Sequence, residues 1–257
     1  RECRLPLMVD STQLDVVEAA LKLYGGRMLV NSINFESGEE KAEKLVALAR
    51  QFGAGLVALT IDETGMAMTA QRKVEIAGRL IAFCEQRGLR RGDLLIDTLT
   101  FTVGSGDPSL RSAAVETIGA IRRIKREFPG VRTLLGLSNI SFGLKPAARK
   151  VLNTVFLDRC IKAGMDACII NTAALVPLTD LAPEAVKLAE KLLDNDASRG
   201  DPLENYIQHF EAAAPEAEAG AAGVSLTPEE QVAAALVKGK AALLETSIPA
   251  LLAKMAA

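Results

Sequence analysis

The segment Gly55-Leu56-Val57-Ala58-Leu59-Thr60-Ile61-Asp62 is an apolar run that ends in a carboxylate. Runs of this kind are typical of parallel strands that are buried on both faces. Five other segments follow the same pattern, and each ends at an acid or an amide. The six runs are Leu5–Val9, Arg27–Val30, Gly55–Ile61, Asp93–Ile96, Arg132–Ser138 and Ala167–Ile170, and the polar residues that end or follow them are Asp10, Asn31, Asp62, Asp97, Asn139 and Asn171.

A stretch with helical periodicity follows each run, so that strands and helices alternate along the chain. The expected helices cover about residues 13–24, 38–52, 69–87, 107–128, 146–163 and 182–193. This alternation predicts a parallel sheet, and the polar residues should then meet at the edge of the sheet where its strands end. In a βα barrel that edge holds the active site.

The number of βα units leaves two folds open. Six units are two short of a closed (β/α)8 barrel, and an open doubly wound sheet is the other arrangement that they allow. No Gly-x-Gly-x-x-Gly segment follows the first run, which disfavours a dinucleotide-binding fold.

The composition indicates a large core and little net charge. Of the 257 residues, 49% are apolar, and the formal net charge is −2. We expect no nucleic acid partner, because no run of Lys and Arg is interleaved with aromatic residues. We also expect no membrane span, because no apolar run reaches the roughly 18 residues that one requires.

Thiol and imidazole groups are scarce. The spacing of the four cysteines, Cys3, Cys84, Cys160 and Cys168, matches no zinc motif. We therefore expect buried structural thiols, no metal site and a cytoplasmic setting. The only histidine, His209, lies in a polar amphipathic segment, so we expect it at the surface and exclude a histidine-based triad.

The composition changes towards the C-terminus. Residues 1–212 hold the βα units, and residues 213–226 form a segment poor in apolar periodicity, which predicts a flexible linker. Thr227-Pro228-Glu229-Glu230 then combines an N-cap, a proline at the first helical position and the acid of a capping box. Residues 227–257 are therefore expected to begin a helical module.

The predicted edge of the sheet suits a polar heterocycle better than a metal. Asp10 and Asp97 each offer a carboxylate that accepts two parallel hydrogen bonds, as the guanidine-like edge of a pterin requires. Asn31 adds an amide with a donor and an acceptor. Asp62 and Asn171 are further candidates, although every one of these residues also suits a turn or a helix cap.

The segment Gly136–Gly143 is the most distinctive stretch of the chain. It combines a strand end, the amide of Asn139, two hydroxyls that include Ser141, and an aromatic residue beside a glycine. This combination predicts an amide-bearing loop over a ligand, with a simple turn as the alternative. Lys145 and Arg149 follow closely, and they suit either a surface helix or an anionic ligand tail.

Together these segments resemble the family of pterin-binding barrels. The resemblance covers roughly residues 5–212, and it is closest to the methyltetrahydrofolate-binding domains of cobalamin-dependent methionine synthases. The residues from Thr227 onward resemble the first helices of a cobalamin-cap module. The segments that carry the resemblance are Leu7–Thr12, Val30–Ile33, Asp97-Thr98, Gly136–Leu144, Asn153–Leu157 and Ala163–Asp166.

The resemblance implies an α/β fold, a (β/α)8 barrel that lacks its first two strands and is followed by a short helical segment. It implies a methyltransferase that binds 5-methyltetrahydrofolate and transfers the N5 methyl group to cob(I)alamin held by a separate domain. By similarity, Asp10, Asn31 and Asp97 hold the pterin edge. Asn139 stabilises the protonated N5, and Lys145 and Arg149 lie near the folate tail.

Two other functions remain open. The chain also suits a stand-alone methyltransferase that serves a separate corrinoid protein, or a folate-binding fragment without turnover. It has no cluster of three cysteines for a homocysteine-binding zinc site and no Asp-x-His-x-x-Gly segment for cobalamin. A dihydropteroate synthase is disfavoured, because that family would place a basic residue where this chain has Leu137-Ser138-Asn139.

Overall fold

The computed structural model describes residues 5–212 together with Ile248 and Leu252. The linker predicted at residues 213–226 lies outside the described residues, as does the helical module predicted at 227–257, apart from Ile248 and Leu252. The chain divides into two compact units, Arg1–Phe210 and Glu211–Ala257. The sheet and its helices belong to the first unit.

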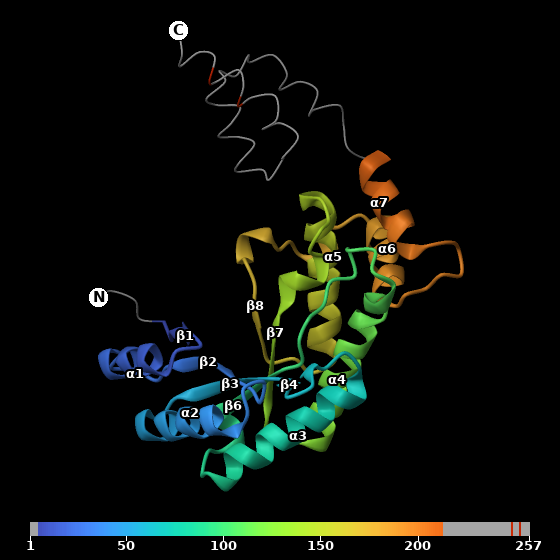
Figure 1. Cartoon of the computed structure of the whole chain (residues 1–257). Coiled ribbons are helices and arrows are strands. Elements are labelled where there is room, and N and C mark those ends of the chain that lie inside the picture. Colours follow the sequence, from blue (N-terminus) through green and yellow to red (C-terminus); the bar gives the residue numbers. More distant parts are fainter. Residues whose placement is uncertain (1–4, 213–247, 249–251, 253–257) are drawn as a thin grey trace. The chain divides into compact units, whose positions relative to one another are not determined.

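Six parallel strands form one curved sheet with helices along its outer side (Figure 1). In the sheet they stand in the order in which they occur along the chain. Because this order never reverses, the arrangement is that of part of a βα barrel, whereas a doubly wound sheet reverses at a switch point. Within the described residues the sheet is open, with β1 and β8 at its two edges. The strands are β1 (Met8–Asp10), β2 (Leu29–Ile33), β3 (Gly55–Leu59), β6 (Leu94–Asp97), β7 (Arg132–Gly136) and β8 (Ala167–Ile169).

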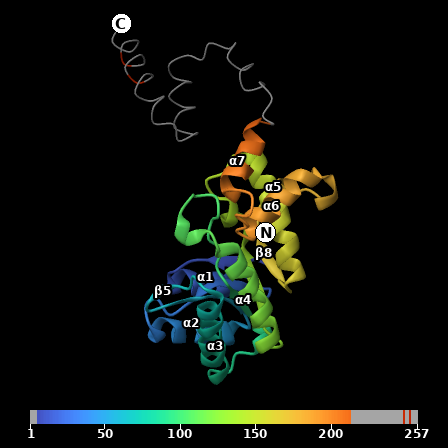
Figure 2. The ribbon, with the colours of Figure 1, turned by 90° about the vertical axis from the view of Figure 1, so that its right-hand side faces the viewer.

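The helices agree closely with the periodicity of the sequence. Five of the six predicted helices begin and end within about one residue of the observed bounds. Figure 2 shows that α3 and α4 lie side by side. None of the helices among the described residues is both long and apolar enough to cross a membrane. The helices are α1 (Leu14–Leu23), α2 (Glu39–Phe52), α3 (Ala70–Gln86), α4 (Ala113–Glu127), α5 (Pro146–Lys162), α6 (Pro183–Leu193) and α7 (Pro202–Ala212).

Several predicted boundaries are wrong by two or more residues: β1 begins at Met8, β2 covers Leu29–Ile33 and β7 ends at Gly136, and at two further places the local structure also differs. The helix expected from residue 107 begins only at Ala113, because the Asp107 carboxylate accepts a hydrogen bond from the Ser109 amide (2.9 Å) and Pro108–Leu110 forms a separate 3-10 turn, η2. The run expected to continue to Asp62 ends as a sheet strand at Leu59. The chain then turns into a small hairpin of β4 (Ile61–Asp62) and β5 (Gly65–Met66).

The remaining short elements are 3-10 turns at the strand and helix ends. They are η1 (Arg91–Asp93), η3 (Leu137–Ser141), η4 (Thr172–Ala174) and η5 (Leu178–Asp180).

Strand side chains alternate between two environments. In β6, Leu94 and Ile96 pack against the helices, whereas Leu95 joins Val57 and Leu134 on the opposite face of the sheet. We call this opposite face the inner face, and Val57, Leu95 and Leu134 the inner cluster. The other strands repeat the alternation, because successive side chains of a strand point to opposite faces. In β2 it ends at the register shift between Asn31 and Ile33, since both Val30 and Ile33 pack against the helices.

The cysteines fall largely where they were expected. Cys84 and Cys160 are buried, which confirms their prediction as core thiols, and burial raises the pKa of the Cys84 thiol to about 12. Cys168 is partly buried, and Cys3 lies outside the described residues.

His209, which was expected at the surface, is half-buried and lies edge-on to Phe210 at 5.1 Å between ring centroids.

Two phenylalanines provide a matched test of the core. Phe156 on α5 is fully buried, whereas Phe142 is 68% exposed. We expect Phe156→Ala to lower the free energy of unfolding by about 3–5 kcal/mol, because it removes apolar contacts and leaves a cavity. Phe142→Ala should change it by less than about 0.5 kcal/mol in the same urea titration. Equal losses in both variants would contradict this assignment of the core.

Candidate functional site

Three of the predicted polar residues share the inner face. Asp10 is paired in register with Asn31 across β1 and β2, and Asp97 ends β6, two residues after Leu95. Alternation along each strand therefore directs Asp10, Asn31 and Asp97 to the side that carries the inner cluster. The result is a set of hydrogen-bonding groups beside an apolar floor, which suits a flat heterocycle with polar edges.

Asp97 is the most deeply placed of the three. Its side chain is only 8% exposed, and its Oδ1 accepts a hydrogen bond from the backbone amide of Leu99 (2.7 Å). Burial raises the pKa of the Asp97 carboxyl to about 6, against the opposing effects of the Leu99 amide, the Lys73 ammonium and the Gly136 amide. Asp97 is therefore a carboxylate at neutral pH that is held in a fixed orientation.

Asn139 approaches the same point from the next strand. It lies on η3, and a Cβ atom built on Gly136 would be 3.3 Å from its Nδ2 atom. The amide of Asn139 thus lies over Gly136, whose own backbone N–H serves Asp97. Gly136 brings Asp97 and Asn139 together, a role that nothing in the sequence pattern indicates.

Ser141 and Arg149 support the segment that carries Asn139. Ser141 is fully buried, with its Oγ 2.8 Å from Asn153 Oδ1. Arg149 Nε donates a hydrogen bond to Ser141 Oγ (3.1 Å), and its Nη2 reaches the Ser138 carbonyl oxygen (3.4 Å). Arg149 was predicted near an anionic ligand tail and Ser141 was a further candidate, and in the structure the contacts of both hold η3.

The loops that follow β6 and β7 are joined. Thr102 Oγ1 donates to the Phe142 carbonyl oxygen (2.7 Å), and the Val103 amide donates to the Ile140 carbonyl oxygen (3.0 Å). A Cβ atom on Gly104 would be 2.7 Å from the Leu144 side chain, so only glycine fits at this approach. These contacts join the loop that follows Asp97 to the segment that carries Asn139.

A groove of about 430 Å³ lies at the ends of β7 and β8. We call it the donor groove, because its polar lining carries cations, amides and a hydroxyl but no carboxylate. The Asn171 Oδ1 atom accepts a hydrogen bond from the Ala173 amide (3.1 Å), and Lys145 is the exposed N-cap residue of α5 nearby in sequence. The groove is lined by Ser138, Pro146, Arg149, Lys150, Asn153, Ile170, Asn171 and Ala173.

Asp62 lies apart from the inner face. It is 1% exposed on the β4–β5 hairpin and forms ion pairs with Arg72 and Arg79 of α3. Burial alone would raise the pKa of its carboxyl, but hydrogen bonds from Thr64 and the nearby Arg72 guanidinium bring it below the usual value. Because arginines already neutralise this carboxylate, Asp62 serves the packing of the hairpin on α3.

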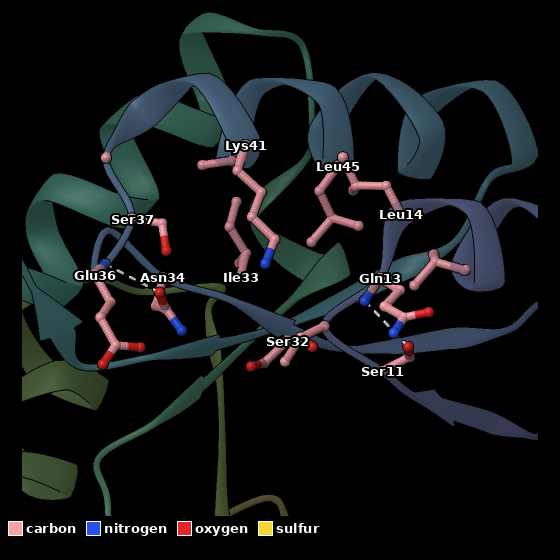
Figure 3. Close-up of a pocket in the computed structure, with 14 residues that line it drawn as sticks. Ser11, Gln13, Leu14, Ser32, Ile33, Asn34, Glu36, Ser37, Lys41 and Leu45 are labelled. Atoms are coloured by element: carbon pink, nitrogen blue, oxygen red, sulfur yellow. Dashed lines mark hydrogen bonds between the residues drawn. The ribbon is translucent and has the colours of Figure 1, made fainter.

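A second, smaller pocket of about 70 Å³ lies between the β1–α1 and β2–α2 loops (Figure 3). Ser11, Gln13 and Lys41 contribute its polar lining, and Ile33 and Leu45 its apolar wall. Ile33 and Leu45 belong to the core between the sheet and the helices, so this pocket is separate from the inner face.

No cluster of three or more His, Cys, Asp or Glu side chains suited to a metal occurs within the described residues.

Comparison with known proteins gives a consistent family. The family model of pterin binding enzymes matches residues 1–171. The methionine synthase of Mycobacterium tuberculosis is 47% identical over 212 residues, and that of Mycobacterium leprae is 44% identical over 211 residues. Each match covers 80% of this chain but only 18% of the relative, so the matched region spans less than a fifth of those proteins.

Among solved structures, the chain is similar to a dihydropteroate synthase from Xanthomonas albilineans in complex with 7,8-dihydropteroate. The TM-score is 0.48 at 16% sequence identity, over 83% of this chain and 70% of that chain.

The raised pKa of Asp97 gives a stability prediction. Between about pH 4 and pH 6 the folded chain holds a proton on Asp97 that the unfolded chain has released, so the stability from this group is full at low pH and is lost as pH rises through 6. Asparagine does not titrate. From pH 4 to pH 7, the free energy of unfolding of Asp97→Asn should therefore rise relative to the wild type by up to about 3 kcal/mol.

Urea denaturation of both proteins at several pH values measures this difference. If the difference in free energy of unfolding between the two proteins stays constant across this pH range, the pKa of the Asp97 carboxyl is not raised.

Proposed function

The chain belongs to the family of pterin-binding enzymes, and from this we propose that it is the methyltetrahydrofolate-binding domain of a cobalamin-dependent methionine synthase. The observation that carries the proposal is the shared inner face of Asp10, Asn31 and Asp97 with the amide of Asn139 beside it. The identity to two mycobacterial methionine synthases supports it.

The inner-face residues would bind the pterin by its polar edge. Asp97, ionised above about pH 6, would accept two hydrogen bonds from the amino-pyrimidine edge, which is a strong geometry because the acceptor is charged. Asp10 and Asn31, opposite each other on β1 and β2, would complete the contacts. The inner cluster of Val57, Leu95 and Leu134 would lie beneath the ring.

Asn139 would act on the reacting nitrogen. The N5 atom of methyltetrahydrofolate is a poor leaving group until it carries a proton, so a group that stabilises the protonated form speeds methyl transfer. With its Nδ2 over Gly136, Asn139 would offer Oδ1 as the hydrogen-bond acceptor for N5–H. Its contribution would be preorganised electrostatics rather than acid catalysis.

The methyl group would leave for another domain. Cob(I)alamin held on that domain would supply the nucleophile. The partners would then be a cobalamin-binding domain and small-molecule folate, in the cytoplasm. A stand-alone methyltransferase that serves a corrinoid protein, or a folate-binding fragment without turnover, would share the same folate site.

The direct test mixes the chain with 5-methyltetrahydrofolate and cob(I)alamin and follows the visible absorbance change that accompanies methylation of cobalamin. We expect a rate above the background of free reactants. Asn139→Ala should lower that rate by roughly 10²- to 10³-fold, the loss typical of one preorganised donor or acceptor, and should weaken folate binding much less.

The control is Asn205→Ala, which removes an amide on α7 that donates to the Arg199 carbonyl oxygen. It should leave the rate unchanged. If Asn139→Ala lowers folate affinity and the rate of methyl transfer equally, the proposed role of Asn139 at N5 is wrong. Folate binding without turnover in the wild type would favour the non-catalytic alternative, and no binding would contradict the proposal.

We further propose that the donor groove holds the glutamate tail of the folate. The tail carries carboxylates, and Arg149, Lys150 and Asn171 line the groove. Lys145 lies at the start of α5, the same helix that carries Arg149 and Lys150. Charge complementarity of this kind orients a ligand more than it tightens binding when the groups are exposed.

Lys150 offers the cleaner test, because Arg149 also supports η3. Lys150→Met should weaken binding of 5-methyltetrahydrofolate roughly two- to fivefold and leave binding of a 5-methyltetrahydropterin without the tail unchanged, as measured by calorimetry. Lys187→Met on α6 is the matched control and should change neither affinity. If Lys150→Met weakens the binding of both ligands equally, the glutamate tail does not bind in the donor groove.

A further inference from the structure

Lys73 is a buried ammonium immediately behind the candidate site. It lies on α3 and is fully buried. Its Nζ donates to the Thr98 and Leu99 carbonyl oxygens, the second at 3.1 Å, and lies 3.4 Å from Thr117 Oγ1. Burial of a charge is costly unless hydrogen bonds compensate for it, so these contacts define what the residue does.

The contacts of Lys73 hold a backbone turn that Asp97 depends on. Leu99 adopts φ = 59°, in the left-handed region that a branched side chain seldom occupies. This conformation directs the Leu99 amide back to Asp97 Oδ1 at 2.7 Å. Lys73 binds the carbonyl groups of Thr98 and Leu99, and Thr117 Oγ1 also donates to the Leu99 carbonyl oxygen (2.9 Å).

Besides Lys73 and Thr117, the start of the loop is held at the Asp97 carbonyl oxygen, which accepts from the Thr60 amide and hydroxyl (both 3.1 Å). The buried hydroxyls of Thr98 and Thr100 have no hydrogen-bond partner in the part of the chain that the structure describes. The Lys73 ammonium also lies 5.0 Å from the centre of the Phe101 ring. Thr102, the next residue along, is already bonded to the Asn139 segment at the Phe142 carbonyl oxygen.

The charges around Lys73 come from two elements. Burial lowers the pKa of the Lys73 ammonium to about 8, and the carboxylates of Asp97 on β6 and Glu116 on α4 oppose this effect. In the other direction, the charge of Lys73 lowers the pKa of Asp97 against the effect of burial. Lys73 thus favours the ionised form of Asp97 at neutral pH.

We propose that Lys73 is a positioning residue of the pterin site, which sets the orientation of Asp97 by holding the Thr98 and Leu99 carbonyl groups. The proposal rests on the proposed function, because the ligand of Asp97 is taken to be the pterin. Lys73 itself does not contact the substrate. Through the loop that runs on to Thr102, it also contributes to the placement of the Asn139 segment.

Lys73→Met keeps the length of the side chain and removes the charge. We expect kcat/KM for methyltetrahydrofolate to fall roughly 10- to 100-fold, the cost of a small misplacement of a binding group, with most of the loss in KM. The pKa of Asp97, followed by carbon NMR of its carboxyl in the ligand-free chain, should rise. The pH below which folate binding is lost should rise with it.

Lys125→Met is the matched control. Lys125 also serves the structure, through the Val131 carbonyl oxygen and the Asp166 carboxylate, but it lies on α4 outside the site. It should lower the unfolding temperature without changing KM or the titration of Asp97. Thr117→Val, a milder change that removes the second hydrogen bond to Leu99, should shift KM in the same direction as Lys73→Met if the latter does not fold.

The two proposals fail separately. An unchanged Asp97 titration in folded Lys73→Met, or an unchanged KM in both Lys73→Met and Thr117→Val, overturns the role of Lys73 whatever the ligand. Absence of folate binding by the wild-type chain overturns the proposed function, while the NMR titration still reports whether Lys73 holds Asp97.

Discussion

The parallel pairing of six strands in chain order is the constraint on which the rest of the structure depends. Side chains alternate along a regular strand, so Asp10, Asn31 and Asp97, which lie two positions beyond Met8, Leu29 and Leu95, are on the inner face with them. The pairing of β1 with β2 therefore places Asp10 beside Asn31, and the pairing of β6 with β7 places Asp97 beside Leu134. Polar groups from distant parts of the chain thus share one face of the sheet. A slip of one residue in any strand would turn its polar group towards the helices.

The polar groups are held by costly local structure. Asp97 is buried with a raised pKa, Leu99 takes a left-handed conformation and Lys73 is buried as a cation. Each feature opposes stability, and each is compensated by hydrogen bonds within the loop that follows β6. Backbone strain and buried charge persist only where the surrounding fold holds them in place, and they are common at binding and active sites.

Much of this arrangement was predictable from the sequence, because buried parallel strands and amphipathic helices have strong periodic patterns. The hairpin at Asp62 was not, since the apolar run continues through Thr60 and Ile61 although the strand ends at Leu59. Gly136 gave no sign of its contact with Asn139, which depends on the turn of η3. Lys73 did give a signal: with Ile76, Ala77 and Leu80 it occupies the apolar face of α3, where a lysine is unexpected.

The central claim is that a pterin binds on the inner face beside Asn31, Asp97 and Gly136. The most direct measurement is a titration of the isotopically labelled chain with 5-methyltetrahydrofolate, followed by backbone amide NMR. We expect saturable shifts at the amides of Asn31, Leu99 and Gly136, with little change around Ser37 and Lys41. Saturable shifts confined to the pocket at Ser37 and Lys41, or no saturable shifts, would contradict it.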